Sequence, residues 1–387
     1  MIIFLAPHLE FPTRNGGDIY TEKLSLHLSS YKTVILLATN RQVTYKNGSI
    51  AEVIYFQNKL RSKVWAALRT ILFVSHYLAE RFNTPIYQKK AKLLLLQYPK
   101  ARTLCSMLST SECIKELLPY SKIAILTQND EILWFQNQRH FSKNIFHKIV
   151  AWISENWVKR FLKNEEKKHL FIHITQTDYE GFKVAAPNHK GIVVPAGVDI
   201  SDLSPKKITD GVTRLVFVGT LSVKTNYDAL LFFKNRFWPT LKEKFKTKIE
   251  FQIAGSNPTK SIYELAQEQG WQVFANLEDA ELKAVYECAS FSVLSFPYTT
   301  GAKLKLLNSL AVGLPVLATK NMLSSPEQNF QPNCYSDSPK EWVDHLSKYI
   351  EQGISEQDRQ ICQKYANQFS WQKIVEEFEK TLTELGF

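Results

Sequence analysis

Three short segments place glycine, hydroxyl and lysine side chains where an apolar run gives way to a helical pattern. They are Asn15-Gly16-Gly17-Asp18, Gly219-Thr220-Leu221-Ser222-Val223-Lys224-Thr225-Asn226 and Thr300-Gly301-Ala302-Lys303-Leu304-Lys305. Because glycine lacks a Cβ, backbone N–H groups can approach a phosphate there, and a helix N-terminus adds positive potential. Hydroxyl and ammonium groups bind the same anion. The chemistry that these segments predict is the binding of a diphosphate.

Each segment also has a structural interpretation. Gly16-Gly17 can form an ordinary turn, and Asn226 can cap a helix while Lys224 stays in solvent. Lys303 and Lys305 can lie on a solvent-exposed face of a helix. Because residues two apart on a helix point in different directions, we expect at most one of these two lysines to contact a given phosphate. Spacing alone leaves both interpretations open.

The elements that must position these residues alternate between short apolar runs and longer amphipathic segments, which is typical of parallel sheets with crossover helices. In the first half we predict strands at 2–6, 33–38, 122–127 and 170–175, and helices at 18–29, 62–81, 131–140 and 144–168. In the second half we predict strands at 214–219, 248–254, 271–275, 291–296 and 315–319. In such sheets ligands bind at the carboxyl ends of the strands.

The same pattern predicts two doubly wound domains. A polar stretch at 199–213, with Pro205 and Asp210-Gly211, separates domains at 1–198 and 214–366 and is predicted to be a linker. A helical segment at 367–387 follows. The chain has 387 residues, which suits two domains of ordinary size.

Composition excludes several classes of protein. Charged residues make up 22% and hydrophobic residues 44%, values that are far from those of disordered chains. No apolar run approaches the length of a membrane span, and the five cysteines form no CxxC pair, so we expect neither a membrane helix nor a zinc site. Met1 leads directly into an apolar run without a basic region, so we expect the cytoplasm rather than export.

The run from Gly301 to Thr319 carries the specific resemblance, because a lysine-containing helix ends there in Ala311-Val312-Gly313-Leu314-Pro315-Val316. It looks like the nucleotide-sugar motif of the retaining GT-B glycosyltransferases of family 4, also called glycosyl transferases group 1. The segments 217–233, 175–178 with 194–199, and 15–17 resemble that family's other landmarks in the same order. The resemblance therefore spans nearly the whole chain.

The resemblance implies a GT-B fold, in which two Rossmann-like domains face a central cleft, with residues 367–387 packing back on the N-terminal domain. It implies transfer of a hexose-type sugar, with retention, from a nucleotide-sugar of UDP or GDP type to a glycan, lipid-linked or other hydroxyl acceptor in polysaccharide biosynthesis. The leaving diphosphate can accept the proton, and no Asp-x-Asp motif follows a strand, so we expect no metal and no cofactor beyond the donor. The implied site residues are Gln128, Asn129 and Gly17 for catalysis, and Gly16, Gly17, Thr220, Lys224, Asn226, Thr300, Gly301, Ala302, Lys303, Lys305 and Asn308 for the donor. On the acceptor side we expect Arg14, Asn15, Asp18 and Glu131, from their positions in loops alone.

Several positions depart from the family pattern. Two acidic residues that usually flank the third loop are replaced by Thr300 and Asn308, and a histidine near the reacting sugar is replaced by Gln128. Thr220 and Asn226 stand where an arginine and a lysine often support the diphosphate. These replacements favour a second hypothesis, a catalytically silent homologue that binds nucleotide-sugar or acts as the scaffold of a partner glycosyltransferase.

The net charge of +11 indicates an anionic partner. No nucleic-acid-binding motif is present, so we expect no nucleic acid. Residues 59–102 and 144–168 mix lysine and arginine with aromatic and leucine residues, a composition that suits helices lying on an anionic membrane. The other interpretation is core-facing apolar residues with solvated lysines. The membrane interpretation predicts peripheral attachment at the inner face of the cell membrane.

Overall fold

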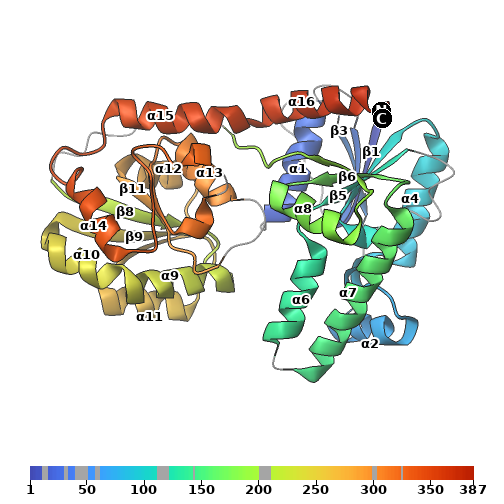
Figure 1. The fold of residues 1–387 in the computed structure, drawn as a ribbon, viewed down its shortest axis with the longest axis horizontal. Coiled ribbons are helices and arrows are strands. Elements are labelled where there is room, and N and C mark those ends of the chain that lie inside the picture. Colours follow the sequence, from blue (N-terminus) through green and yellow to red (C-terminus); the bar gives the residue numbers. More distant parts are fainter. Residues whose placement is uncertain are drawn as a thin grey trace. The chain divides into compact units, whose positions relative to one another are not determined.

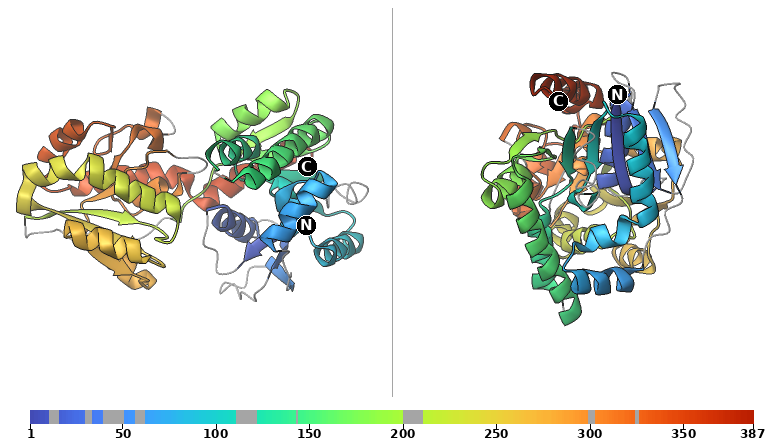
Figure 2. Two further views of the ribbon diagram at one scale, coloured as in Figure 1. Left: turned by 90° about the horizontal axis from the view of Figure 1, so that it is seen from below. Right: turned by 90° about the vertical axis from the view of Figure 1, so that its right-hand side faces the viewer.

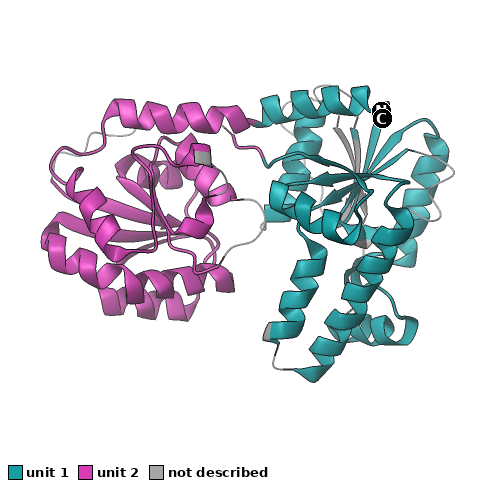
Figure 3. Cartoon of the chain, in the orientation of Figure 1, with its two compact units in different colours: residues 1–196, 371–387 teal, residues 197–370 magenta. Residues whose placement is uncertain are grey.

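The computed structural model describes residues 1–10, 16–29, 34–39, 51–56, 62–110, 122–142, 144–199, 211–298, 303–323 and 326–387. The chain divides into two compact units, Met1–Ala196 with Trp371–Phe387 (unit 1) and Gly197–Ser370 (unit 2) (Figure 3). Each unit has its own parallel sheet with helices packed around it (Figure 1). Of the predicted linker at 199–213, residues 200–210 lie outside the described ranges.

Unit 1 is built on a sheet of seven parallel strands in the order β3-β2-β1-β4-β5-β6-β7. Its strands are β1 (Ile2–Glu10), β2 (Val34–Thr39), β3 (Ala51–Phe56), β4 (Arg102–Ser106), β5 (Ile123–Thr127), β6 (Leu170–His173) and β7 (Lys190–Val193). Its helices are α1 (Gly16–Leu28), α2 (Lys63–Phe73), α3 (Tyr77–Phe82), α4 (Pro85–Gln97), α6 (Glu131–Phe141), α7 (Ile145–Glu165), α8 (Gln176–Ala185) and α16 (Trp371–Glu384).

Unit 2 repeats this arrangement with six parallel strands in the order β10-β9-β8-β11-β12-β13. Its strands are β8 (Thr213–Val218), β9 (Ile249–Gly255), β10 (Gln272–Ala275), β11 (Phe291–Leu294), β12 (Val316–Ala318) and β13 (Cys334–Tyr335). Its helices are α9 (Lys224–Arg236), α10 (Trp238–Phe245), α11 (Lys260–Gln269), α12 (Asp279–Cys288), α13 (Leu304–Ala311), α14 (Pro339–Ser347) and α15 (Glu356–Ala366).

Both strand orders reverse direction once, between β1 and β4 in unit 1 and between β8 and β11 in unit 2. At such a switch point the chain leaves adjacent strands toward opposite faces of the sheet, which opens a crevice at their carboxyl ends. The glycine segments that follow β1 and β8 begin at these two points. The predicted pair of doubly wound domains is therefore confirmed.

Each unit encloses its own core. In unit 2 an aromatic cluster packs under the sheet, and the rings of Phe237 and Trp342 stack with centroids 4.0 Å apart. In unit 1 the last helix, α16, packs against α1, where the Trp371 ring contacts Tyr20 edge-on and stacks on His27. The Tyr20 hydroxyl donates to the Val194 carbonyl at 2.9 Å, which satisfies a buried phenol.

The predicted single helix at 62–81 is wrong, because the chain forms α2 and α3 with a break between them. Val74 caps α2 in a left-handed conformation with φ 47° and ψ 49°, and its N–H bonds to the Thr70 carbonyl. His76 then caps α3 through its Nδ1 atom. A β-branched residue is strained in this region, which glycine occupies freely.

We expect Val74→Gly to raise the free energy of unfolding by about 0.5–1 kcal/mol, because relief of left-handed strain exceeds the entropy that glycine adds to the unfolded chain. Val74 is half exposed, so little apolar burial is lost. The control is Val184→Gly at an exposed position of α8, which should lower stability by a few tenths of a kcal/mol. Denaturant titration measures both; a loss of stability in Val74→Gly would contradict the strain.

Candidate active site

The loop after β8 forms the centre of the candidate site in unit 2. The Gly219 N–H donates to the Ala254 carbonyl and the Leu221 N–H donates to the Ser256 carbonyl, so the loop is fixed on the end of β9. Asn226, in the first turn of α9, is buried and its Nδ2 donates to the Thr220 carbonyl at 2.8 Å. Its Oδ1 is buried without a hydrogen-bond partner among the described residues. Asn226 therefore holds the loop and keeps one polar atom unused.

Lys305 reaches the same loop from α13. A Cβ placed on Gly219 would lie 3.0 Å from Lys305 Cε and 3.1 Å from Asn226 Nδ2, so both side chains border this glycine. Lys305 Nζ lies 5.5 Å from the centroid of the Phe296 ring, and burial lowers the pKa of its ammonium. Within the described ranges no carboxylate contacts it. The arrangement is a desolvated cation beside an unused amide oxygen, at a sheet switch point.

The other predicted donor lysines are placed differently. Lys224, exposed at the start of α9, pairs with Asp228 at 2.6 Å, and the Tyr298 hydroxyl donates to the same carboxylate at 2.7 Å. The Asp228 carboxylate raises the pKa of Lys224, so its charge is already engaged. Lys303 is the residue before the first turn of α13 and is half-buried.

The helix predicted to open at Gly301 begins at Leu304. Only Lys305 of the two lysines lies inside it. Asn308 is exposed on α13, whereas its neighbour Ser309 is buried and donates to Ser292 Oγ. Thr300, Gly301 and Ala302 lie outside the described residues, as do Arg14 and Asn15 of unit 1.

In unit 1 the structure brings Gln128 against Gly17. Gln128 Nε2 lies within hydrogen-bond distance of Gly17 O at 3.1 Å, Thr21 Oγ1 at 2.9 Å and Ser106 Oγ at 3.0 Å. A Cβ on Gly17 would lie 2.0 Å from Gln128 Oε1. Gln128 is buried and joins the first turn of α1 to the ends of β4 and β5. These contacts make it a positioning residue for the glycine turn, with Gly16 exposed next to it.

The predicted acceptor-side carboxylates are not open to solvent. Glu131 is buried; its Oε1 accepts from the Leu108 N–H at 3.1 Å and its Oε2 lies 3.1 Å from His76 Nε2. These contacts hold α6 to the core and favour a structural role over the predicted one. Asp18 is buried with its Oδ1 3.6 Å from His8 Nε2. Burial lowers the pKa of His8 to about 4, so this histidine is neutral at pH 7. Asn129 is half-buried after β5.

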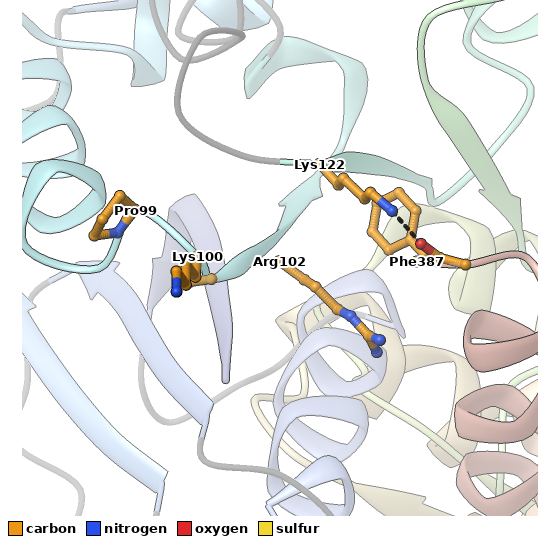
Figure 4. Close-up of a pocket in the computed structure, with 7 residues that line it drawn as sticks. Pro99, Lys100, Arg102, Lys122 and Phe387 are labelled. Atoms are coloured by element: carbon orange, nitrogen blue, oxygen red, sulfur yellow. Dashed lines mark hydrogen bonds between the residues drawn. The ribbon is translucent and has the colours of Figure 1, made fainter.

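One pocket of unit 1 lies away from these residues. It has a volume of about 330 Å³ and is lined by Pro99, Lys100, Ala101, Arg102, Lys122, Gly386 and Phe387 (Figure 4). Lys122 points to the end of the chain and donates to the Gly386 carbonyl. Arg102 and Lys122 stand at the amino ends of β4 and β5, opposite to the ends where crevices form. This pocket is therefore not the candidate site.

Comparisons with known proteins give a sequence match to part of the chain and structural matches to all of it. Residues 212–352 match the family model described as Glycosyl transferases group 1, a range that contains Gly219, Asn226 and Lys305. The match lies wholly within unit 2. No curated protein matches the chain in sequence.

Solved structures extend the likeness to the whole chain. Anabaena HepE in complex with UDP and glucose has a TM-score of 0.64 and 13% identity, with 99% of each chain covered. WaaG, a glycosyltransferase involved in lipopolysaccharide biosynthesis, has 0.62 and 14%, with 99% and 100% covered. The catalytic domain of starch synthase IV from Arabidopsis thaliana has 0.62 and 12%, with 99% and 98% covered. These likenesses confirm the predicted GT-B fold.

Other observations bear on the remaining expectations. Among the described residues, no group of three or more His, Cys, Asp or Glu side chains is arranged to hold a metal ion. No described helix is long and apolar enough to cross a membrane.

Sequence reasoning missed Thr21 and Ser106, whose hydroxyls lie 3.0 Å apart and surround Gln128. In the sequence, these two residues are recognisable only as polar. Their burial, which makes them part of the site, follows from the fold.

A double-mutant cycle tests the link between Gly17 and Gln128. We expect Gly17→Ala to cost about 1–3 kcal/mol, because the new Cβ displaces Gln128 from buried hydrogen bonds. In a Gln128→Ala background the same change should be neutral or stabilising by up to about 1 kcal/mol, since alanine favours the helix. Denaturant titration of the four proteins gives the coupling energy. Equal effects of Gly17→Ala in both backgrounds would show that the link does not exist.

Proposed function

We propose that the chain transfers a hexose-type sugar from a nucleoside diphosphate sugar, of UDP or GDP type, to a hydroxyl acceptor, with retention of configuration and without a metal. The observation that carries this proposal is the Lys305 ammonium, which is desolvated beside Phe296 and has no counter-charge among the described residues. An unpaired buried cation is unfavourable for the folded protein, and such groups are typical of functional sites. A bound diphosphate would supply the missing charge.

The neighbouring groups suit the same ligand. Asn226 Oδ1 is an unused acceptor, which can take a hydrogen bond from a nucleotide hydroxyl. The Gly219 N–H is already bonded to the Ala254 carbonyl, so a phosphate at this turn would meet the two side chains that border the glycine, Lys305 and Asn226. The first turn of α9 adds the positive end of a helix dipole. These groups support the proposal that the donor binds in unit 2.

The proposed reaction makes little demand for a protein base. The bond from the anomeric carbon to the diphosphate oxygen breaks, and the acceptor hydroxyl forms its new bond on the same face. The acceptor proton passes to the leaving diphosphate oxygen. What the protein must supply is stabilisation of the negative charge that develops on the diphosphate, which is the role that we assign to Lys305.

We propose that the residues of unit 1 orient the backbone and the sugar and do not themselves react. Gln128 fixes the backbone of Gly17, so the N–H groups of the first glycine turn are held in one orientation. Asn129 follows directly and is half-buried, which suits orientation of sugar hydroxyls. The engagement of Gln128 in three contacts also favours the alternative of a silent homologue, because the amide has no hydrogen left for a substrate.

The proposed acceptor is a glycan or a lipid-linked sugar used in polysaccharide biosynthesis. A lipid-linked acceptor would require the chain to work at a membrane, and we propose peripheral attachment to the inner, cytoplasmic face of an anionic membrane. The positive net charge supports this attachment.

A panel of UDP, GDP, dTDP and ADP sugars tests the proposal. Thermal stabilisation by one donor, with release of its nucleoside diphosphate in EDTA, would establish a metal-independent enzyme. NMR of the product then gives the anomeric configuration. Stabilisation with no turnover, even when acceptors are supplied, would favour the silent homologue, and no stabilisation by any donor would contradict both.

Substitution of Lys305 separates donor binding from folding. We expect Lys305→Met to leave the free protein at least as stable, because it removes a desolvated charge. Affinity for the donor should fall about 10- to 100-fold with the loss of a charge-assisted hydrogen bond. The control is Lys340→Met, at an exposed position of α14 in the same unit, which should change neither. Unchanged donor affinity in Lys305→Met, measured by calorimetry, would refute the assignment.

The pH dependence has a defined sign. Because burial lowers the pKa of Lys305, its ammonium loses a proton at a lower pH than an exposed lysine does. Donor affinity should therefore decrease as the pH rises toward this lowered pKa. Lys305→Arg, which stays charged, should remove the decrease.

A further inference from the structure

Three helices of unit 1 expose apolar side chains that no other described element covers. Helix α6 packs along α7, and α2 lies beside α7 at the same end of the unit (Figures 1 and 2). The exposed side chains are Val64, Trp65, Leu68, Leu72 and Phe73 of α2, Leu133 and Trp134 of α6, and Ile145, Ile149 and Trp152 of α7. We call this set the α2–α6–α7 surface.

The exposed positions follow helical spacing. Val64, Leu68 and Leu72 recur every four residues along α2, while Ala66, Ala67 and Thr70 are buried. On α7, Ile145, Ile149 and Trp152 form one stripe, which continues toward the C-terminus with Arg160 and Lys163. Helices α2 and α7 therefore each present an exposed apolar face that is separate from the core face.

Tryptophan is concentrated on this surface. Trp65, Trp134 and Trp152 are 51%, 38% and 53% exposed, whereas the other five tryptophans of the chain are buried or half-buried. An indole has an apolar body and one N–H donor, a combination that is most stable at the boundary between lipid chains and headgroups. Three exposed indoles on three adjoining helices indicate a partner with such a boundary.

The charges around this surface have one sign. The carboxylates of α2, α3, α4, α6 and α7 are all buried: Glu80, Glu131, Glu155 and Glu165. The exposed cations on α2, α6 and α7 are Lys63, Arg139, Lys159, Arg160 and Lys163. Arg139 and Lys159 pair with Glu155 at 3.5 and 2.6 Å, and the other three have no carboxylate partner among the described residues. An isologous contact with a second copy would bring these cations together, which is unfavourable. An anionic partner is favoured instead.

We propose that the α2–α6–α7 surface docks on an anionic lipid bilayer, with its indole and aliphatic side chains at the headgroup boundary and its cations against lipid phosphates. This inference deepens the membrane attachment proposed above by naming the surface and the lipid charge. It does not depend on the donor site, which lies in unit 2. The two proposals can therefore fail separately.

Vesicle flotation tests the docking. We expect the full chain to bind vesicles that contain phosphatidylglycerol, to bind phosphatidylcholine vesicles much more weakly, and to dissociate as salt is raised. Failure to bind the anionic vesicles at low salt would overturn the proposal, as would equal binding to both lipids.

Two sets of variants locate the contact. Trp65→Ser/Leu72→Ser/Trp152→Ser should weaken vesicle binding at least about tenfold, as the buried apolar contacts are lost. Its control is Val184→Ser/Tyr263→Ser/Ile361→Ser, which changes three exposed apolar residues elsewhere. Arg160→Gln/Lys163→Gln should also weaken binding about tenfold, whereas Lys244→Gln/Lys340→Gln, the same charge change in unit 2, should not.

Donor-induced thermal stabilisation distinguishes the outcomes. It should be unchanged in all four variants, which also shows that they fold. Equal loss of vesicle binding in a variant and its control would reject the surface. A concentration-dependent dimer that the apolar variant abolishes would identify a second copy, and not lipid, as the occupant. Vesicle binding without thermal stabilisation by any donor would contradict the proposed transfer but not the proposed docking.

Discussion

The partly buried ammonium of Lys305, beside Phe296, is the group on which the account of function depends. Burial lowers its pKa and the described residues offer it no counter-charge, so the free protein keeps an unfavourable charge at one fixed point. That point is the end of β8, where the strand order reverses. Ligands of open α/β sheets bind at such a switch point, and the lysine supports the proposal of an anionic ligand there.

A side-chain amide holds each of the two glycine turns, but in a different way. In unit 2, Asn226 bonds the turn through one amide atom and leaves the other unused. In unit 1, the Nε2 atom of Gln128 contacts Gly17, Thr21 and Ser106. The unused atom of Asn226 is buried, whereas the amide nitrogen of Gln128 already has its partners within the protein. This difference supports the proposal that the donor binds in unit 2 and that unit 1 acts on the acceptor side.

Much of the fold could be predicted because apolar runs such as 2–6 and 291–294 lie in buried parallel strands. The strands β3, β4, β7 and β13 were missed; β4 carries arginine, threonine and serine, β7 starts with Lys190-Gly191, and β13 has two residues. Their identity as strands depends on neighbours in the sheet, which local pattern does not contain. The break at Val74 was missed because valine gives no signal for a left-handed cap.

The sequence was sufficient to predict which loops form the site, but not which side chains meet there. Glycine and hydroxyl residues after apolar runs mark Gly17 and Gly219, and helical spacing indicates that Lys303 and Lys305 diverge. The direction of the Lys305 side chain depends on Phe296 and Gly219. Gly219 is distant from α13 in sequence, and Phe296 is separated from it by a loop. The contact of Gln128 with Gly17 joins residues 111 positions apart, and the burial of Glu131 depends on His76. Such pairings are set by tertiary packing.

A crystal structure of the chain with a bound nucleoside diphosphate tests the central claim most directly. The account predicts the diphosphate beside Gly219, with an oxygen within hydrogen-bond distance of Lys305 Nζ and with Asn226 Oδ1 bonded to the nucleotide. A nucleotide bound elsewhere, with Lys305 still unpaired, would contradict it.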